Sequence, residues 1–111
     1  YPTISSLCGL EVPARLQGKN ISAMLDNPTH TVRDAAFCVN GRGFLLREDR
    51  WAYIQYGENA ARGIELFDMK DDPKQYSNLA GLPRFKPVVD AFKAKFAAKM
   101  KAVRDNDLGR K

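Results

Sequence analysis

Apolar and polar residues alternate along the middle of the chain and change to a helical spacing near its end. Alternation is typical of β-strands, and it marks four segments at residues 35–39, 42–47, 51–56 and 64–68. The links between these segments are short, whereas parallel strands need a crossover of roughly a dozen residues. The pattern therefore predicts a meander of four antiparallel strands.

The predicted turns lie between these segments. Asn40-Gly41 separates the first two strands and is the strongest short hairpin signal, because both central residues of such a turn must accept a positive φ. A second tight turn is expected at residues 48–50. Within the third strand, Trp51 and Tyr53 fall on one face and Ala52, Ile54 and Tyr56 on the other.

A long amphipathic helix is predicted over residues 85–103. Apolar residues recur there at steps of three and four, which places them along one side of the helix: Phe85, Val88, Val89, Phe92, Phe96, Met100 and Val103. An antiparallel sheet needs cover for one apolar face. The fold class is therefore α+β, with a four-stranded antiparallel meander packed against one long C-terminal helix and preceded by an N-terminal helical and loop segment.

The N-terminal segment has a different pattern, which predicts short helices and loops. Residues 1–7 are predicted to be helical, with Pro2 in the first turn and Gly9 in the left-handed position beyond the end. A loop over residues 11–18 leads to a short helix at 22–25, which Asn27-Pro28 ends. Residues 1–30 are predicted to be a linker, and residues 31–111 a sheet-and-helix subdomain.

Composition narrows the class of protein. A chain of 111 residues with 44% hydrophobic and 28% charged residues is typical of one globular domain. No apolar run reaches the length of a membrane span, and no signal-peptide pattern is present. Cys8 and Cys38 are expected to be two free, packed thiols.

The net charge of +5 comes largely from the C-terminal third. One interpretation of its lysine cluster is a surface that binds an acidic polymer; the other is a solvated helix face. We favour the solvated face, because no aromatic residues interleave with the lysines and no nucleic-acid motif is present. The cationic residues are Lys86, Lys93, Lys95, Lys99, Lys101 and Arg104.

Catalytic groups are sparse in this sequence. His30 is the only histidine, so the sequence offers no second imidazole for a metal site, and His30 has no nucleophile context for a triad. Asp71 and Asp72 are the one adjacent carboxylate pair that resembles metal ligands. They precede Pro73 in a turn, where aspartate is favoured for its local hydrogen bonds. We therefore predict no catalytic residue and no metal ligand within the chain.

Two motifs resemble one known family. The stretch 66–80, Leu-Phe-Asp-Met-Lys-Asp-Asp-Pro-Lys-Gln-Tyr-Ser-Asn-Leu-Ala, resembles the C-terminal signature of sulfatases: Leu-Tyr-Asp-Leu, Asp-Pro-x-Glu, Asn-Leu-Ala. Tyr1-Pro2-Thr3-Ile4, with Gly9-Leu10 and Val12-Pro13 after it, resembles the segment by which sulfatases leave their catalytic domain. Within the alkaline-phosphatase-like superfamily, the iduronate-2-sulfatase-like group is the most similar. Phe67 and Gln75 stand where Tyr and Glu are usual.

The resemblance implies a sulfuric ester hydrolase as the parent enzyme, acting on sulfated carbohydrate. The family uses a formylglycine made in a Cys/Ser-x-Pro-x-Arg motif and a divalent metal, calcium. Neither cysteine and no serine fits that motif here, so both groups are expected in a missing N-terminal catalytic domain, which would be the partner of this segment. The parent would be periplasmic, secreted or lysosomal, a choice that the resemblance leaves open.

Three residues are candidates for the rim of a substrate pocket completed by that domain: His30, Arg33 and Arg42. They lie in or beside the loops that lead to the first hairpin, and a guanidinium suits sulfate or carboxylate oxygens. A surface role is the competing interpretation. The chain itself is expected to be non-catalytic and to self-associate through apolar surface. The alternative function is a free-standing module that binds an acidic polymer through the lysine-rich helix.

Overall fold

The computed structural model describes residues 1–105 and divides into two compact units. Residues 35–100 form one unit, and residues 1–34 form the other together with the end of the C-terminal helix from Lys101. Residues 106–111 of the predicted subdomain lie outside the described range.

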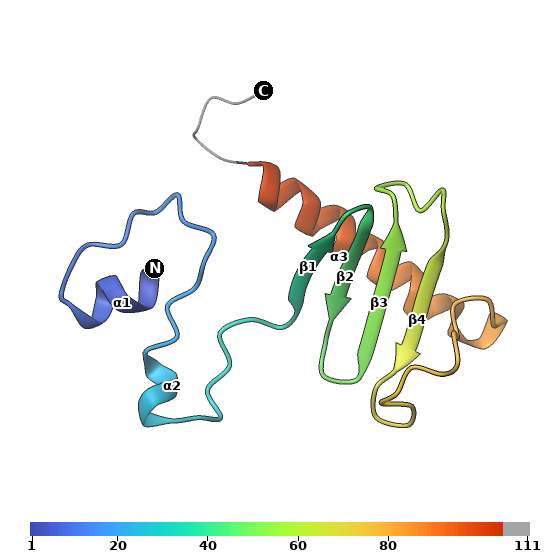
Figure 1. Ribbon diagram of the computed structural model, residues 1–111, viewed down its shortest axis with the longest axis horizontal. Helices are drawn as coiled ribbons and strands as arrows, with labels where there is room; N and C mark the ends of the chain where they lie inside the picture. The colour runs from blue at the N-terminus through green and yellow to red at the C-terminus, as the bar shows by residue number, and fades with distance from the viewer. Residues whose placement is uncertain (106–111) are drawn as a thin grey trace. The chain divides into compact units, whose positions relative to one another are not determined.

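The larger unit contains the predicted meander (Figure 1). Strands β1 (Ala36–Asn40), β2 (Gly43–Arg47), β3 (Trp51–Tyr56) and β4 (Ile64–Asp68) pair in the order β1-β2-β3-β4, and every pairing is antiparallel. The four-stranded antiparallel sheet is therefore confirmed. The third and fourth strands have the predicted bounds, and the first two begin one residue later than predicted.

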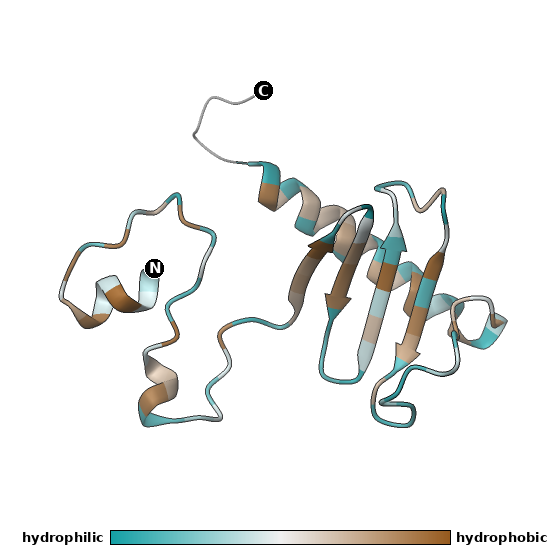
Figure 2. Ribbon diagram, in the orientation of Figure 1, coloured by the Kyte–Doolittle hydropathy of each residue, from teal (hydrophilic) through white to brown (hydrophobic). Residues whose placement is uncertain are grey.

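One face of the sheet carries the core. The register aligns Phe37, Leu46, Tyr53 and Leu66 across all four strands, so their side chains share a face. Helix α3 (Lys86–Arg104) packs on this face, and its residues alternate between hydrophobic and hydrophilic along the ribbon (Figure 2). The buried core cluster consists of Leu46, Tyr53, Leu66, Val89, Phe92 and Phe96.

The predicted helix is also confirmed, with a short 3-10 turn, η1 (Pro83–Phe85), in front of it. Pro87 is tolerated because the first helical turn has no intrahelical acceptor for its missing N–H. The ring of Phe92 stacks on Tyr53 with centroids 5.4 Å apart, and Trp51 meets Phe85 edge-on at 5.9 Å. The apolar stripe therefore serves packing, and so do Trp51 and Tyr53.

The first hairpin turn is shifted by one residue from the prediction. Asn40 pairs with Gly43, so the central residues are Gly41 and Arg42. Gly41 has a φ of 57°, whereas Asn40 and Arg42 have negative φ values. Glycine takes the left-handed conformation without a steric cost, which leaves Asn40 free to remain in the strand.

The prediction that both thiols are packed is wrong. Cys8 and Cys38 are free, but both are exposed. Because Phe37 faces α3, the neighbouring Cys38 must point to the other side of the sheet, where it pairs with Leu45. Cys8 lies at the exposed end of the first helix.

The smaller unit contains α1 (Pro2–Leu7) and α2 (Ala23–Asp26). Both helices agree with the prediction within a residue, and Gly9 follows α1 with a φ of 69°, as expected for a helix-ending glycine. Five large apolar side chains of this unit are more than half exposed: Tyr1, Ile4, Leu7, Leu10 and Leu25. Across residues 1–105, none of the helices has both the length and the apolar character needed to cross a membrane.

Candidate functional site

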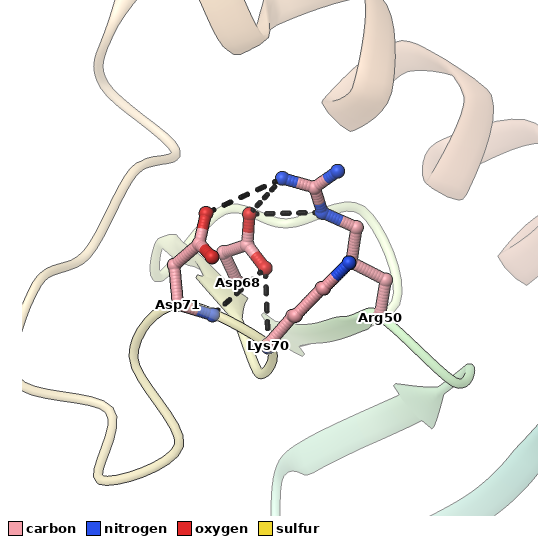
Figure 3. A network of polar contacts seen from close by, with 4 residues as sticks. All are labelled: Arg50, Asp68, Lys70 and Asp71. Atoms are coloured by element: carbon pink, nitrogen blue, oxygen red, sulfur yellow. Dashed lines mark hydrogen bonds and ion pairs between the residues drawn. The ribbon is translucent and has the colours of Figure 1, made fainter.

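The signature turn that follows β4 is organised by Asp68, whose side chain is buried at the end of the strand (Figure 3). Its Oδ2 accepts hydrogen bonds from Arg50 Nε at 2.9 Å and Nη2 at 2.6 Å. Its Oδ1 accepts from the backbone N–H groups of Lys70 and Asp71 at 3.2 and 3.4 Å. Both oxygens of the carboxylate are thus engaged in holding the turn.

The electrostatics of this pair follow from the contacts. The hydrogen bonds from Arg50 lower the pKa of Asp68, and the two backbone donors lower it further against the opposing effect of desolvation. The same pair raises the pKa of Arg50. Asp68 is therefore a fixed, charged anchor and not a group poised to exchange a proton near neutral pH.

The rest of the signature closes the turn. Asp72 Oδ2 accepts from the N–H of Ser77 at 2.8 Å, and Gln75 adopts a φ of 59°. The side chain of Asn78 hydrogen-bonds to the backbone of β4. Its Oδ1 accepts from the N–H groups of Leu66 and Ala80, each at 3.0 Å, and its Nδ2 donates to the carbonyl of Ile64. The motif that resembles the sulfatase signature therefore has a structural role.

These contacts bear on metal binding. Asp68 and Asp71 both contact Arg50 Nη2, at 2.6 and 3.5 Å, and Asp72 accepts from Ser77. The position between the first two carboxylates is therefore taken by the guanidinium of Arg50 and is not open to a metal ion. No group of three or more potential metal-ligating residues occurs within residues 1–105. The aspartates of the turn accordingly do not fit a catalytic calcium site.

The opposite end of the sheet presents a different environment. In a meander, the β1–β2 turn and the β3–β4 loop lie at the same end, as Figure 1 shows. The N–H of Gly57 donates to the carbonyl of Arg42 at 2.9 Å and ties the two connections together. A concavity at this end is lined by Gly41, Arg42, Phe44, Gly57, Glu58 and Arg62.

A buried polar pair supports the β3–β4 loop. Tyr53 Oη donates to Gln55 Oε1 at 2.7 Å, and Gln55 Nε2 donates to the carbonyls of Gly57 and Glu58 at 3.0 and 2.6 Å. Burial raises the pKa of Tyr53 to about 12, so its phenol stays protonated. Because a buried amide is costly unless it is hydrogen-bonded, Gln55 couples the position of the loop to the core.

The three predicted rim candidates are all exposed. His30 and Arg33 belong to the smaller unit and Arg42 to the larger one, so only Arg42 can be assigned to the concavity. Sequence reasoning did not single out Arg62 or Gln55. Their roles depend on which connections share an end of the sheet, and no local pattern reports that.

The lysine-rich helix is partly neutralised. Lys86 pairs with Asp90 one turn along α3, and Lys95 pairs with Glu48 from the β2–β3 turn. The ammonium groups of Lys95 and Lys99 also lie over the rings of Phe92 and Phe37. These contacts give part of the cluster an intramolecular role.

Comparison with known proteins places the chain among sulfatases. Arylsulfatase K of Bos taurus is 30% identical over 93 residues, which are 72% of this chain and 17% of that protein. A sulfatase of Formosa agariphila is 30% identical over 95 residues, or 85% of this chain and 18% of that protein. The solved structure of a 2-O GAG sulfatase matches with a TM-score of 0.78 at 25% identity, covering 99% of this chain and 25% of that one.

The chain spans less than a fifth of the length of these curated relatives. A family model described as "N-sulphoglucosamine sulphohydrolase, C-terminal" matches residues 1–102, which includes both sequence motifs and every helix and strand except the last two residues of α3. The chain therefore belongs to the N-sulphoglucosamine sulphohydrolase C-terminal family, within the sulfatase superfamily.

Proposed function

We propose that this chain is the C-terminal domain of an enzyme that hydrolyses sulfate esters of carbohydrates. The observation that carries the proposal is the family match over residues 1–102, together with the agreement of its fold with a 2-O GAG (glycosaminoglycan) sulfatase. Placement in the iduronate-2-sulfatase-like group is a finer part of the proposal, supported by the Tyr1-Pro2-Thr3-Ile4 segment.

Within that enzyme the domain would be structural and non-catalytic. Its sequence lacks the Cys/Ser-x-Pro-x-Arg motif: Cys38 has Arg42 four places on but Asn40 where the motif needs proline. The nucleophile and its divalent metal would lie in the catalytic domain. In this domain, His30, Arg33 and Arg42 would be contributors to the substrate rim.

Turnover measurements test whether catalysis lies outside this domain. The purified chain should not hydrolyse an aryl sulfate, whereas the longer protein that contains it should do so. Activity of the chain alone that survives replacement of both Cys8 and Cys38 by Ser would mean that the chemistry lies within residues 1–111.

The partner we propose is the catalytic domain itself. Support comes from Tyr1, Ile4, Leu7 and Leu10, which leave apolar surface exposed along the first ten residues. In the absence of a partner, this surface should make the chain self-associate. Sedimentation velocity over a range of concentrations tests it: the double variant Ile4→Ser and Leu7→Ser should shift the chain toward monomer, and a wild-type chain that is monomeric throughout would count against the proposal.

The alternative function is binding of an acidic polymer through α3. The observation in its favour is that Lys93, Lys99 and Lys101 are exposed on one helix. Replacing Lys99 and Lys101 by Gln should abolish binding to heparin under this alternative and leave it unchanged under the first proposal.

A further inference from the structure

Two arginines from different connections line the concavity at one end of the sheet. Arg42 is in the two-residue turn between β1 and β2, and Arg62 is in the loop between β3 and β4. Both side chains are exposed. The two arginines are 20 positions apart in sequence, and the antiparallel meander brings both to the lining of one concavity.

The backbone that carries these arginines is extensively hydrogen-bonded. The carbonyl of Arg42 accepts from Gly57, and the N–H of Arg62 donates to the carbonyl of Tyr56 at 3.2 Å. Inside the loop, Ala60 donates to Gly57, Gly63 donates to Ala60, and the side chain of Asn59 accepts from Ala61. Gln55 fixes the start of the loop from the core. A connection tied down in this way is pre-organised, which favours a binding role.

The charge arrangement distinguishes this end of the sheet from the other. Arg50, at the signature turn, is paired with Asp68. Within residues 1–105, neither Arg42 nor Arg62 forms an ion pair or a side-chain hydrogen bond. Glu58 lines the same concavity, so the formal charge of the three side chains is +1. A guanidinium offers planar, forked N–H donors that suit an oxyanion. Neither arginine is needed as an ion-pair partner within the fold, so both can serve a ligand.

We propose that Arg42 and Arg62 form a subsite for an oxyanion group of an acidic saccharide, either a sulfate or a uronate carboxylate. The choice of a saccharide rests on the proposed function, whereas the anion site rests on the geometry described above. In the enzyme, such a subsite would bind a charged group of the substrate that is not being hydrolysed. Arg62 is the new residue, and it defines the site jointly with Arg42.

The test is an NMR titration of the ¹⁵N-labelled chain with a heparin-derived disaccharide that carries both sulfate and carboxylate. Shifts should concentrate on the amides of residues 41–44 and 57–63. Arg42→Gln and Arg62→Gln should each weaken binding about threefold to tenfold, the range of a solvent-accessible charge-assisted contact. The desulfated disaccharide shows which group is bound. If it no longer binds, the bound group is the sulfate, and if it still binds, the bound group is the carboxylate.

Two controls make the result decisive. Arg84→Gln removes another exposed guanidinium of the same unit and should not change the affinity. Lys99→Gln with Lys101→Gln tests the helix. The subsite is refuted if the wild type does not bind, if the two arginine variants bind as the wild type does, or if only the lysine variant weakens binding.

Failure of the subsite and failure of the proposed function give different results. In the longer protein, the double variant Arg42→Gln and Arg62→Gln should raise KM for the sulfated saccharide by a larger factor than KM for an aryl sulfate, which carries no second anionic group. If that protein has no sulfatase turnover at all, the proposed function fails, while binding by the chain still decides the anion site.

Discussion

Replacing Phe92 by Ala should remove the central support of the core. The side chain is 2% exposed, its ring stacks on Tyr53, and it belongs to the buried cluster that joins α3 to the sheet. A buried phenylalanine removes on the order of 150–250 Å² from water, which at about 25 cal/mol per Å² is roughly 4–6 kcal/mol. Alanine keeps a part of that burial, so the expected loss is about 3–5 kcal/mol of unfolding free energy.

Urea denaturation followed by circular dichroism measures this loss. Because a small domain has only about 5–15 kcal/mol of stability, Phe92→Ala can leave too little folded protein for an accurate urea titration. Phe92→Leu, expected to cost about 1–2 kcal/mol of unfolding free energy, provides a milder variant of the same contact. Tyr76→Ala is the matched control, since that ring is 80% exposed, and it should change stability by less than about 0.5 kcal/mol. A loss below about 1 kcal/mol for Phe92→Ala, at an unchanged denaturant slope, would refute the packing of α3 on the sheet.

Three further predictions concern the polar networks. Since the folded-state pKa of Asp68 is lowered, its carboxylate stabilises the fold above the unfolded-state pKa and loses that effect as the pH falls through the folded-state pKa. Urea titrations at a series of acidic pH values should therefore show an unfolding free energy that decreases with falling pH in the wild type, and a smaller decrease in Asp68→Asn. Gln55→Leu should leave Tyr53 Oη without its acceptor and speed amide exchange across residues 57–63, whereas Tyr53→Phe should affect the loop less; equal protection in all three proteins would contradict the loop's dependence on Gln55. Asn78→Ala should cost about 1–3 kcal/mol in thermal or urea unfolding, because it leaves Leu66 N–H without its acceptor, and Asn78→Asp, which keeps the acceptor, should cost less.

Most of the fold could be predicted from local patterns. Alternation located all four strands within one residue, and the spacing of Phe92, Phe96 and their neighbours located α3, because both patterns depend on the period of the backbone and on burial of one face. The two errors have local causes. The turn moved to Gly41 and Arg42 because one glycine supplies its only positive φ, and Cys38 is exposed because its neighbour Phe37 faces the helix.

The candidate site could be predicted only in part. The signature from Leu66 to Ala80 identified the family, yet its polar residues are engaged in closing a turn, so the most informative motif does not mark a binding site. Arg42 was identifiable as an arginine beside a hairpin. Arg62 and the supporting Gln55 were not, since an exposed arginine in a loop and a glutamine in a strand are common in any sequence.

By itself, the sequence determined which segments are strands and helices, which side of each is apolar, and to which family the chain belongs. Those properties depend on residues close together along the chain. Tertiary structure decided which residues meet: Arg50 with Asp68 at one end of the sheet, and Arg42 with Arg62 around one concavity at the other. Each pair is about 20 positions apart in sequence, and the register of an antiparallel meander is the physical reason that its members come together.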